Sequence, residues 1–66
     1  MNPMKLIKIK EVMDLTGLSR TTIYRLRKLE QFPNPIRLTD TMVRWLESEV
    51  IEWINAHALA RELDRS

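Results

Sequence analysis

The chain has no cysteine, one histidine and one glycine among its 66 residues. Without cysteine it can form neither a disulfide nor a cysteine-ligated metal site, and this composition fits a reducing cytoplasm. No apolar run reaches the length of a signal-peptide core, and none approaches the ~20 residues that cross a membrane. We therefore expect a soluble protein of the cytoplasm, with no membrane segment.

Residues suited to catalysis are also few. His57 falls on the apolar face of the last predicted helix, so we interpret it as a packed or rim residue rather than a metal ligand. Glu49 and Glu52 are one helical turn apart, but nothing near them in the sequence supplies a nucleophile or a metal ligand. The sequence predicts a protein that is not an enzyme and that uses no cofactor, metal or small-molecule ligand.

The charges are unevenly distributed along the chain. Residues 1–46 contain nine lysines and arginines against four acids, a balance of +5, whereas residues 47–66 contain two against five, a balance of −3. Such an asymmetry is expected if one side of a protein faces a polyanion, although ordinary surface charge produces it as well. There is no repeat, linker or low-complexity tract, so residues 1–66 are interpreted as one small domain.

Two short helices joined by a turn are the clearest local prediction. The first covers about residues 10–16, with Val12 and Leu15 on one face, and Gly17 provides a left-handed stop. Ser19 is a suitable N-cap for the second helix, since its hydroxyl can accept a hydrogen bond from an amide two or three residues later. This pattern is typical of a helix-turn-helix, which places its second helix in the major groove of DNA.

The second helix, predicted over about 19–30, divides its side chains into two arcs at ~100° per residue. Ile23, Leu26 and Leu29 share the apolar arc. Any surface helix has a polar face, but four cations, a tyrosine and no acid on one arc favour DNA recognition. The residues of that arc are Arg20, Thr21, Tyr24, Arg25, Arg27 and Lys28.

The position of each residue on this helix suggests its role. Arg20 and Thr21, in the first turn, are the best candidates to reach base edges. Tyr24 is expected to contact a base or a phosphate, and the remaining cations to neutralise phosphates. The first amides of the helix are expected to bind a backbone phosphate. The predicted DNA contacts of this helix are therefore Ser19, Arg20, Thr21, Thr22, Tyr24, Arg25, Arg27 and Lys28.

Residues 36–45 alternate apolar and basic side chains, which predicts a β-hairpin with residues 39–42 as its loop. In this hairpin Arg37 and Arg44 share the outward face. They are expected to enter or flank the adjacent minor groove, as a wing beside the recognition helix, unless they are simply solvated. The inward face is predicted to carry Ile36, Leu38, Val43 and Trp45.

A last helix is predicted over about residues 48–62, with Val50, Trp53, Ile54 and Ala58 facing the core. A second apolar stripe consists of Ala56, Leu59, Ala60 and Leu63. This stripe either packs against residues 1–7, or frays at the terminus, or serves self-association. Self-association has a reason, because one small module buries only ~600–1,000 Å² on DNA and benefits from cooperative neighbours.

Several motifs recur in order along the chain: IKEV at 9–12, TGLSRTTIYRL at 16–26, FPNPIRL at 32–38 and VRWLESEV at 43–50, followed by Trp53. With these motifs the chain resembles the AlpA family of prophage regulators over about residues 6 to 55. The resemblance implies a winged helix-turn-helix, mostly helical with a small β-hairpin, related to phage excisionases and to the DNA-binding heads of MerR-type regulators. It also implies transcriptional control, often of an integrase gene.

The chain departs from this family's pattern at three places. Glu30 stands where the family usually has glycine, near the predicted end of the second helix. Residues 39–41 lack the glycines often found in the wing turn, and Arg27 replaces an often apolar residue.

Three functions remain open from the sequence. The first is a double-stranded DNA-binding transcriptional regulator of a prophage or integrative element, which acts on the nucleoid. The second is an excisionase-like architectural factor that acts with an integrase, and the third is a small protein-interaction adaptor.

Overall fold

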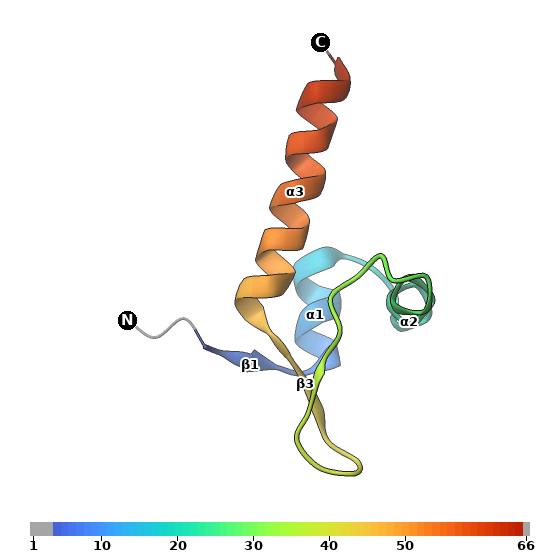
Figure 1. The fold of residues 1–66 in the computed structure, drawn as a ribbon, viewed down its shortest axis with the longest axis vertical. Coiled ribbons are helices and arrows are strands. Elements are labelled where there is room, and N and C mark those ends of the chain that lie inside the picture. Colours follow the sequence, from blue (N-terminus) through green and yellow to red (C-terminus); the bar gives the residue numbers. More distant parts are fainter. Residues whose placement is uncertain (1–3, 66) are drawn as a thin grey trace.

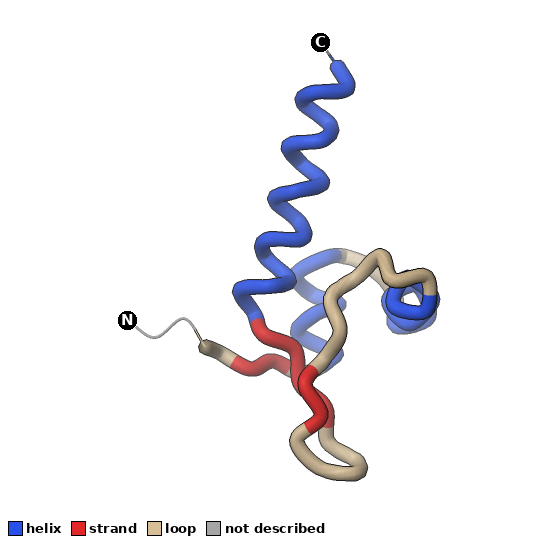
Figure 2. The backbone as a smooth tube through the Cα atoms, viewed as in Figure 1, coloured by secondary structure: helices blue, strands red, loops and turns tan. Residues whose placement is uncertain are grey.

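The computed structural model describes residues 4–65 and consists of three helices and three short strands (Figures 1 and 2). It confirms a mostly helical small domain. In chain order the elements are β1 (Leu6–Ile7), α1 (Ile9–Thr16), α2 (Arg20–Lys28), β2 (Ile36–Arg37), β3 (Val43–Leu46) and α3 (Glu47–Arg65).

The core consists of six buried side chains. These six residues come from β1, α1, α2, the connection after α2, β3 and α3, whereas both residues of β2 are exposed. α1 packs against both α2 and α3, and α3 also contacts β3. The buried residues are Ile7, Val12, Ile23, Phe32, Trp45 and Val50.

Two leucines expected in the core lie at the surface instead. Leu15 is 41% exposed, because α1 turns Val12 inward together with the partly buried Ile9 and Met13. Leu29 is 57% exposed, because α2 ends at Lys28 and the chain has already left the helical path. Leu26, expected on the same arc as Leu29, is partly buried against the core.

The turn between α1 and α2 has the predicted chemistry. Gly17 adopts the left-handed conformation (φ 75°), and its N–H donates to the carbonyl of Met13 at 2.8 Å. Ser19 caps α2, since its hydroxyl oxygen accepts a hydrogen bond from the N–H of Thr22 at 3.2 Å. These two caps fix where α1 ends and α2 begins.

α2 ends with a Schellman motif, two residues earlier than the sequence pattern indicated. The N–H of Glu30 donates to the carbonyl of Arg27 at 2.9 Å, and the N–H of Gln31 donates to that of Leu26 at 2.8 Å. This motif needs a left-handed residue after the cap, and here Glu30 takes that role with φ 59°. A side chain therefore occupies a position that favours glycine.

The connection from α2 to β2 is held by the two tryptophans. The indole N–H of Trp45 donates to the carbonyl of Pro33 at 3.0 Å, and that of Trp53 donates to the carbonyl of Gln31 at 2.8 Å. Between them Phe32 is buried, with its ring 4.8 Å from that of Trp53 in an edge-to-face arrangement. Phe32 anchors the chain as it leaves α2, so the position of α2 relative to the sheet is fixed.

The sheet has three antiparallel strands in the order β1-β3-β2, one more than the predicted hairpin. β1 comes from the short apolar segment at the start of the chain, where Leu6 pairs with Leu46 and Ile7 with Trp45. Two residues are too few for an alternating pattern to be recognised in a sequence. This pairing makes β3 the central strand.

The hairpin register corrects the predicted faces. Ile36 pairs with Arg44 and Arg37 with Val43. Directly opposite residues of an antiparallel pair lie on the same face, so Arg37 and Arg44 lie on opposite faces. Ile36 and Leu38, expected to be inward, are 38% and 46% exposed.

A tighter loop explains the shift. The N–H of Leu38 donates to the carbonyl of Met42 at 2.8 Å, which leaves the three residues 39–41 as the loop instead of the four predicted. The hydroxyl oxygen of Thr39 accepts from the N–H groups of Thr41 and Met42 at 3.3 and 3.0 Å and closes the turn. A shift of one residue moves every side chain of a strand to the other face.

α3 is the longest element and extends beyond the predicted 48–62 at both ends. Val50 is buried and Trp53, Ile54 and Ala58 are half-buried, as the core stripe predicted. The C-terminal half of the helix projects away from the rest of the domain (Figure 1). No helix among the described residues is both long enough and apolar enough to cross a membrane.

Candidate nucleic-acid interface

α2 presents most of the predicted DNA-binding residues at the surface. No acid occurs between Arg20 and Lys28, while Ile23 on the opposite side is fully buried. Thr22 and Arg27 are half-buried, and the other six predicted residues of this helix are exposed: Ser19, Arg20, Thr21, Tyr24, Arg25 and Lys28.

The first turn of α2 combines a satisfied cap with open donors. The hydroxyl of Ser19 donates to the hydroxyl oxygen of Thr22 at 2.9 Å and accepts from its N–H, so both side chains are engaged in capping. The N–H groups of Arg20 and Thr21 belong to the first turn and have no carbonyl partner within the helix. Two backbone donors and the side chains of Arg20 and Thr21 therefore emerge at the same helix end.

Arg27 occupies a different environment from the other cations of α2. Its guanidinium carbon lies 5.4 Å from the ring centre of Tyr24 and 5.9 Å from that of Trp45, within cation–π distance of both. Its Nε is buried and has no hydrogen-bond partner among the described residues. Arg27 therefore braces Tyr24 against the central strand, whereas the sequence pattern placed it on an open phosphate-binding arc.

The two arginines of the hairpin are held by backbone carbonyls of the hairpin itself. A terminal nitrogen of Arg37 donates to the carbonyl of Asp40 at 3.2 Å, and one of Arg44 donates to the carbonyl of Val43 at 2.8 Å. Arg37 is exposed, whereas Arg44 is half-buried beside Trp45. Because the two side chains lie on opposite faces of the hairpin, one DNA groove cannot contact both of them from the same side.

α2 and the hairpin meet at a hollow of about 230 Å³. The start of α1 forms its third wall, so residues distant in the sequence come together here. Two of them, Lys8 and Thr41, were not among the residues predicted from the sequence. No sequence signal pointed to them, because only the β1–β3 pairing and the short loop bring them beside Tyr24. The lining residues are Lys8, Ile9, Tyr24, Thr41, Val43, Arg44 and Trp45.

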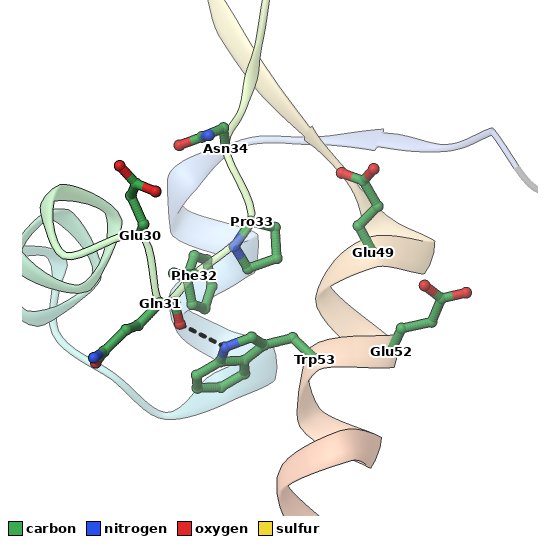
Figure 3. A pocket seen from close by; sticks show the side chains of 8 residues that line it. All are labelled: Glu30, Gln31, Phe32, Pro33, Asn34, Glu49, Glu52 and Trp53. Atoms are coloured by element: carbon green, nitrogen blue, oxygen red, sulfur yellow. Dashed lines mark hydrogen bonds between the residues drawn. The ribbon is translucent and has the colours of Figure 1, made fainter.

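A second, larger hollow of about 620 Å³ has the opposite charge. It lies between the segment after α2 and the first turns of α3, with Phe32, Pro33 and Trp53 between its rims (Figure 3). Glu30 stands on one side and Glu49 and Glu52 on the other. We call it the acidic groove, and its remaining lining residues are Gln31 and Asn34.

No cation lines the acidic groove, and none of its three carboxylates forms an ion pair or hydrogen bond with another described residue. A phosphodiester backbone is repelled by such a surface. We therefore leave the acidic groove out of the candidate nucleic-acid interface.

Among the described residues, no group of three or more His, Asp or Glu side chains is placed to hold a metal ion. The Nδ1 of His57 lies 2.9 Å from the carbonyl oxygen of Trp53, and its ring lies 4.1 Å from the Trp53 ring. His57 is thus engaged with its own helix.

The elements described define a small, mostly helical domain with a three-stranded antiparallel sheet and one cationic surface helix. Residues 5–58 match the family model described as "Prophage CP4-57 regulatory protein (AlpA)", and the chain belongs to the AlpA family. This is a family of regulatory proteins and not of enzymes.

One curated relative of the chain is a protein of Enterobacteria phage P4 named "Uncharacterized protein ORF88". It is 40% identical over 58 residues, which cover 88% of this chain and 66% of the relative. The chain thus spans about two thirds of the length of that protein.

Proposed function

We propose that the protein is a sequence-specific double-stranded DNA-binding transcriptional regulator of a prophage or integrative element, built as a winged helix-turn-helix. The observation that carries this proposal is the exposed face of α2, which has cations from Arg20 to Lys28, no acid, and a buried Ile23 behind it. Membership of the AlpA family supports the regulatory role.

In this proposal α2 lies in the major groove with its N-terminal turn toward the bases. Arg20 donates two hydrogen bonds to a guanine, and Thr21 contacts a thymine methyl or a base edge. Arg25 and Lys28 neutralise phosphates and set the register without reading sequence. Two open amides at the start of α2 add a backbone-phosphate contact.

The β2–β3 hairpin acts as the wing. Of its two arginines, Arg44 is better placed to contact DNA next to α2. Arg44 lies beside the recognition helix, at the same hollow as Tyr24. Arg37 does not line that hollow, and its guanidinium reaches back to the loop. We therefore assign Arg44 to the phosphate backbone next to α2, and Arg37 to a minor-groove or rim contact.

A salt titration tests the proposal. If about four to six phosphates are neutralised, log K falls with log[salt] at a slope near −4 to −5. We expect this slope for duplex DNA in fluorescence anisotropy. A flat dependence, or no binding at low salt, contradicts DNA binding and favours an adaptor that binds protein.

The same fold and face also suit an excisionase-like factor that bends recombination-site DNA. Footprinting separates the two functions. Protection over a promoter supports the transcriptional regulator, whereas protection within the arms of an attachment site supports the architectural factor.

We also infer that the projecting half of α3 mediates self-association of copies bound to neighbouring sites. Leu59 and Leu63 are 61% and 69% exposed there, and Ala56 and Ala60 are exposed beside them. One small module buries little area on DNA, so contacts between copies would raise occupancy. Leu59→Lys is expected to lower cooperativity on a two-site duplex while binding to a single site is unchanged. Unchanged cooperativity would remove this surface from the proposal.

A further inference from the structure

The hollow between α2 and the hairpin is lined by four polar side chains from three different parts of the chain. Lys8 comes from the residue before α1, Tyr24 from the middle of α2, and Thr41 and Arg44 from the hairpin. The ammonium group of Lys8 and the hydroxyls of Tyr24 and Thr41 have no hydrogen bond or ion pair with any described residue. Two cations and two hydroxyl donors thus line one small space.

The acids nearest in sequence do not cancel this positive charge inside the hollow. Glu11 is one turn into α1, and its carboxylate accepts a hydrogen bond from the backbone N–H of Lys8 at 2.9 Å. Asp40 precedes Thr41 in the loop. Neither of them lines the hollow. The groups that do line it are cationic, hydroxylic or apolar.

We infer that this hollow is a binding site for a single backbone phosphate of duplex DNA, with Lys8 as a phosphate ligand beside Arg44. The inference rests on the proposed function. It identifies the part of the DNA that this surface binds, a single backbone phosphate. A phosphodiester carries one negative charge and two unesterified oxygens, which match two cations and two hydroxyl donors. Tyr24 then acts on the backbone and not on a base.

The surrounding structure holds these groups in position. Trp45, fully buried, forms the back of the hollow, and Arg27 braces the Tyr24 ring from the side of Trp45. The hydrogen bonds to the Thr39 hydroxyl fix the loop that carries Thr41. A site assembled from rigid elements loses little conformational entropy when the phosphate binds.

Lys8→Gln tests the site, and Lys10→Gln is its matched control. Lys10 has the same chemistry two residues later, is exposed, and does not line the hollow. We expect Lys8→Gln to reduce the magnitude of the salt slope by about one and to weaken binding about five- to tenfold at low salt, equally for all DNA sequences. Lys10→Gln is expected to keep the wild-type slope. Circular dichroism melts establish that both variants fold.

A duplex with one neutral methylphosphonate, moved along the backbone one position at a time, locates the phosphate. We expect one position at which the methylphosphonate lowers the affinity of the wild type. At that position it is expected to cause no further loss of affinity in Lys8→Gln. Thr41→Val changes a residue of the exposed loop and is expected to weaken binding two- to threefold. Its affinity losses along the methylphosphonate series are expected to follow those of Lys8→Gln. Additive losses for Lys8→Gln at every methylphosphonate position overturn the inference.

The outcomes separate this inference from the proposed function. If the wild type does not bind DNA, the proposed function fails, and the phosphate site with it. If the wild type binds and Lys8→Gln keeps the full salt slope, only the phosphate site is wrong. Equal losses for Lys8→Gln and Lys10→Gln show a general charge effect and also overturn the site.

Discussion

The two hollows of this domain share one construction but carry opposite charge. Each has an aromatic back wall with a tryptophan, Trp45 in the basic hollow and Trp53 in the acidic groove. Both indoles hold the same short connection by hydrogen bonds to its carbonyls. The charges differ because one hollow is rimmed by Lys8 and Arg44 and the other by three glutamates. The net charge of +2 therefore describes neither side of the protein.

This difference gives the molecule an orientation toward a polyanion. The sequence predicted a basic first part and an acidic last part, and the structure refines the division. Glu30 belongs to the first part of the chain yet joins Glu49 and Glu52 at the acidic groove. The polarity is thus a property of the folded surface, and the chain halves approximate it only roughly.

The largest expected effect concerns the two tryptophans. Trp45→Ala removes a fully buried indole and its hydrogen bond, and it is expected to cost about 3–5 kcal/mol of unfolding free energy. A domain this small tolerates little of that loss. Trp53→Ala, at a half-buried residue, is expected to cost about 1–2 kcal/mol. Urea unfolding measures both. Equal losses would mean that the two hollows depend on their tryptophans to the same extent.

The next largest effect is on DNA affinity. We expect Arg20→Ala, Tyr24→Ala and Arg25→Ala together to weaken DNA binding at least about a hundredfold, near 3 kcal/mol, because base and phosphate contacts are lost at once. Arg61→Ala, which removes an exposed cation of α3, is the control and is expected to leave affinity unchanged. Retained affinity in the triple variant would exclude α2 as the recognition helix.

The sequence predicted the helices well, because their signals are local. Gly17 and Ser19 act through hydrogen bonds to residues at most four positions away, so the turn between α1 and α2 was correctly placed. The cationic face of α2 likewise follows from helical periodicity alone. The predictions that were wrong concerned contacts between residues far apart in the sequence. The hairpin register depends on the Thr39 hydroxyl, and the β1–β3 pairing joins residues about 40 positions apart.

The candidate site divides in the same way. The exposed residues of α2 were predicted from one segment, whereas Lys8 and Thr41 become neighbours of Tyr24 only through the sheet. The position of Arg27 between two rings also depends on Trp45, 18 residues later in the chain. No pattern within a single helix contains that information.

A smaller effect, on stability, is expected at the edge of the acidic groove. Glu30 holds a left-handed conformation that glycine adopts without strain, so Glu30→Gly should raise the unfolding free energy by about 0.5–1 kcal/mol. For a domain of this size the melting temperature then rises by roughly 2–8 °C. Glu30→Ala removes the same charge but keeps the Cβ, and it is expected to give no such gain. A lower melting temperature for Glu30→Gly would contradict the strain.

The smallest effect is the sharpest test of the contrast between the two hollows. Glu49→Gln with Glu52→Gln removes two carboxylates from the acidic groove, and we expect DNA affinity to rise by less than about twofold in 0.1 M salt. The gain is small because mobile ions screen these exposed charges from phosphates farther away than about 10 Å. Arg25→Gln with Lys28→Gln changes the charge on α2 by the same magnitude with the opposite sign and is expected to weaken binding about tenfold or more. A change of comparable size for the glutamate pair, in either direction, would place the acidic groove in contact with the DNA.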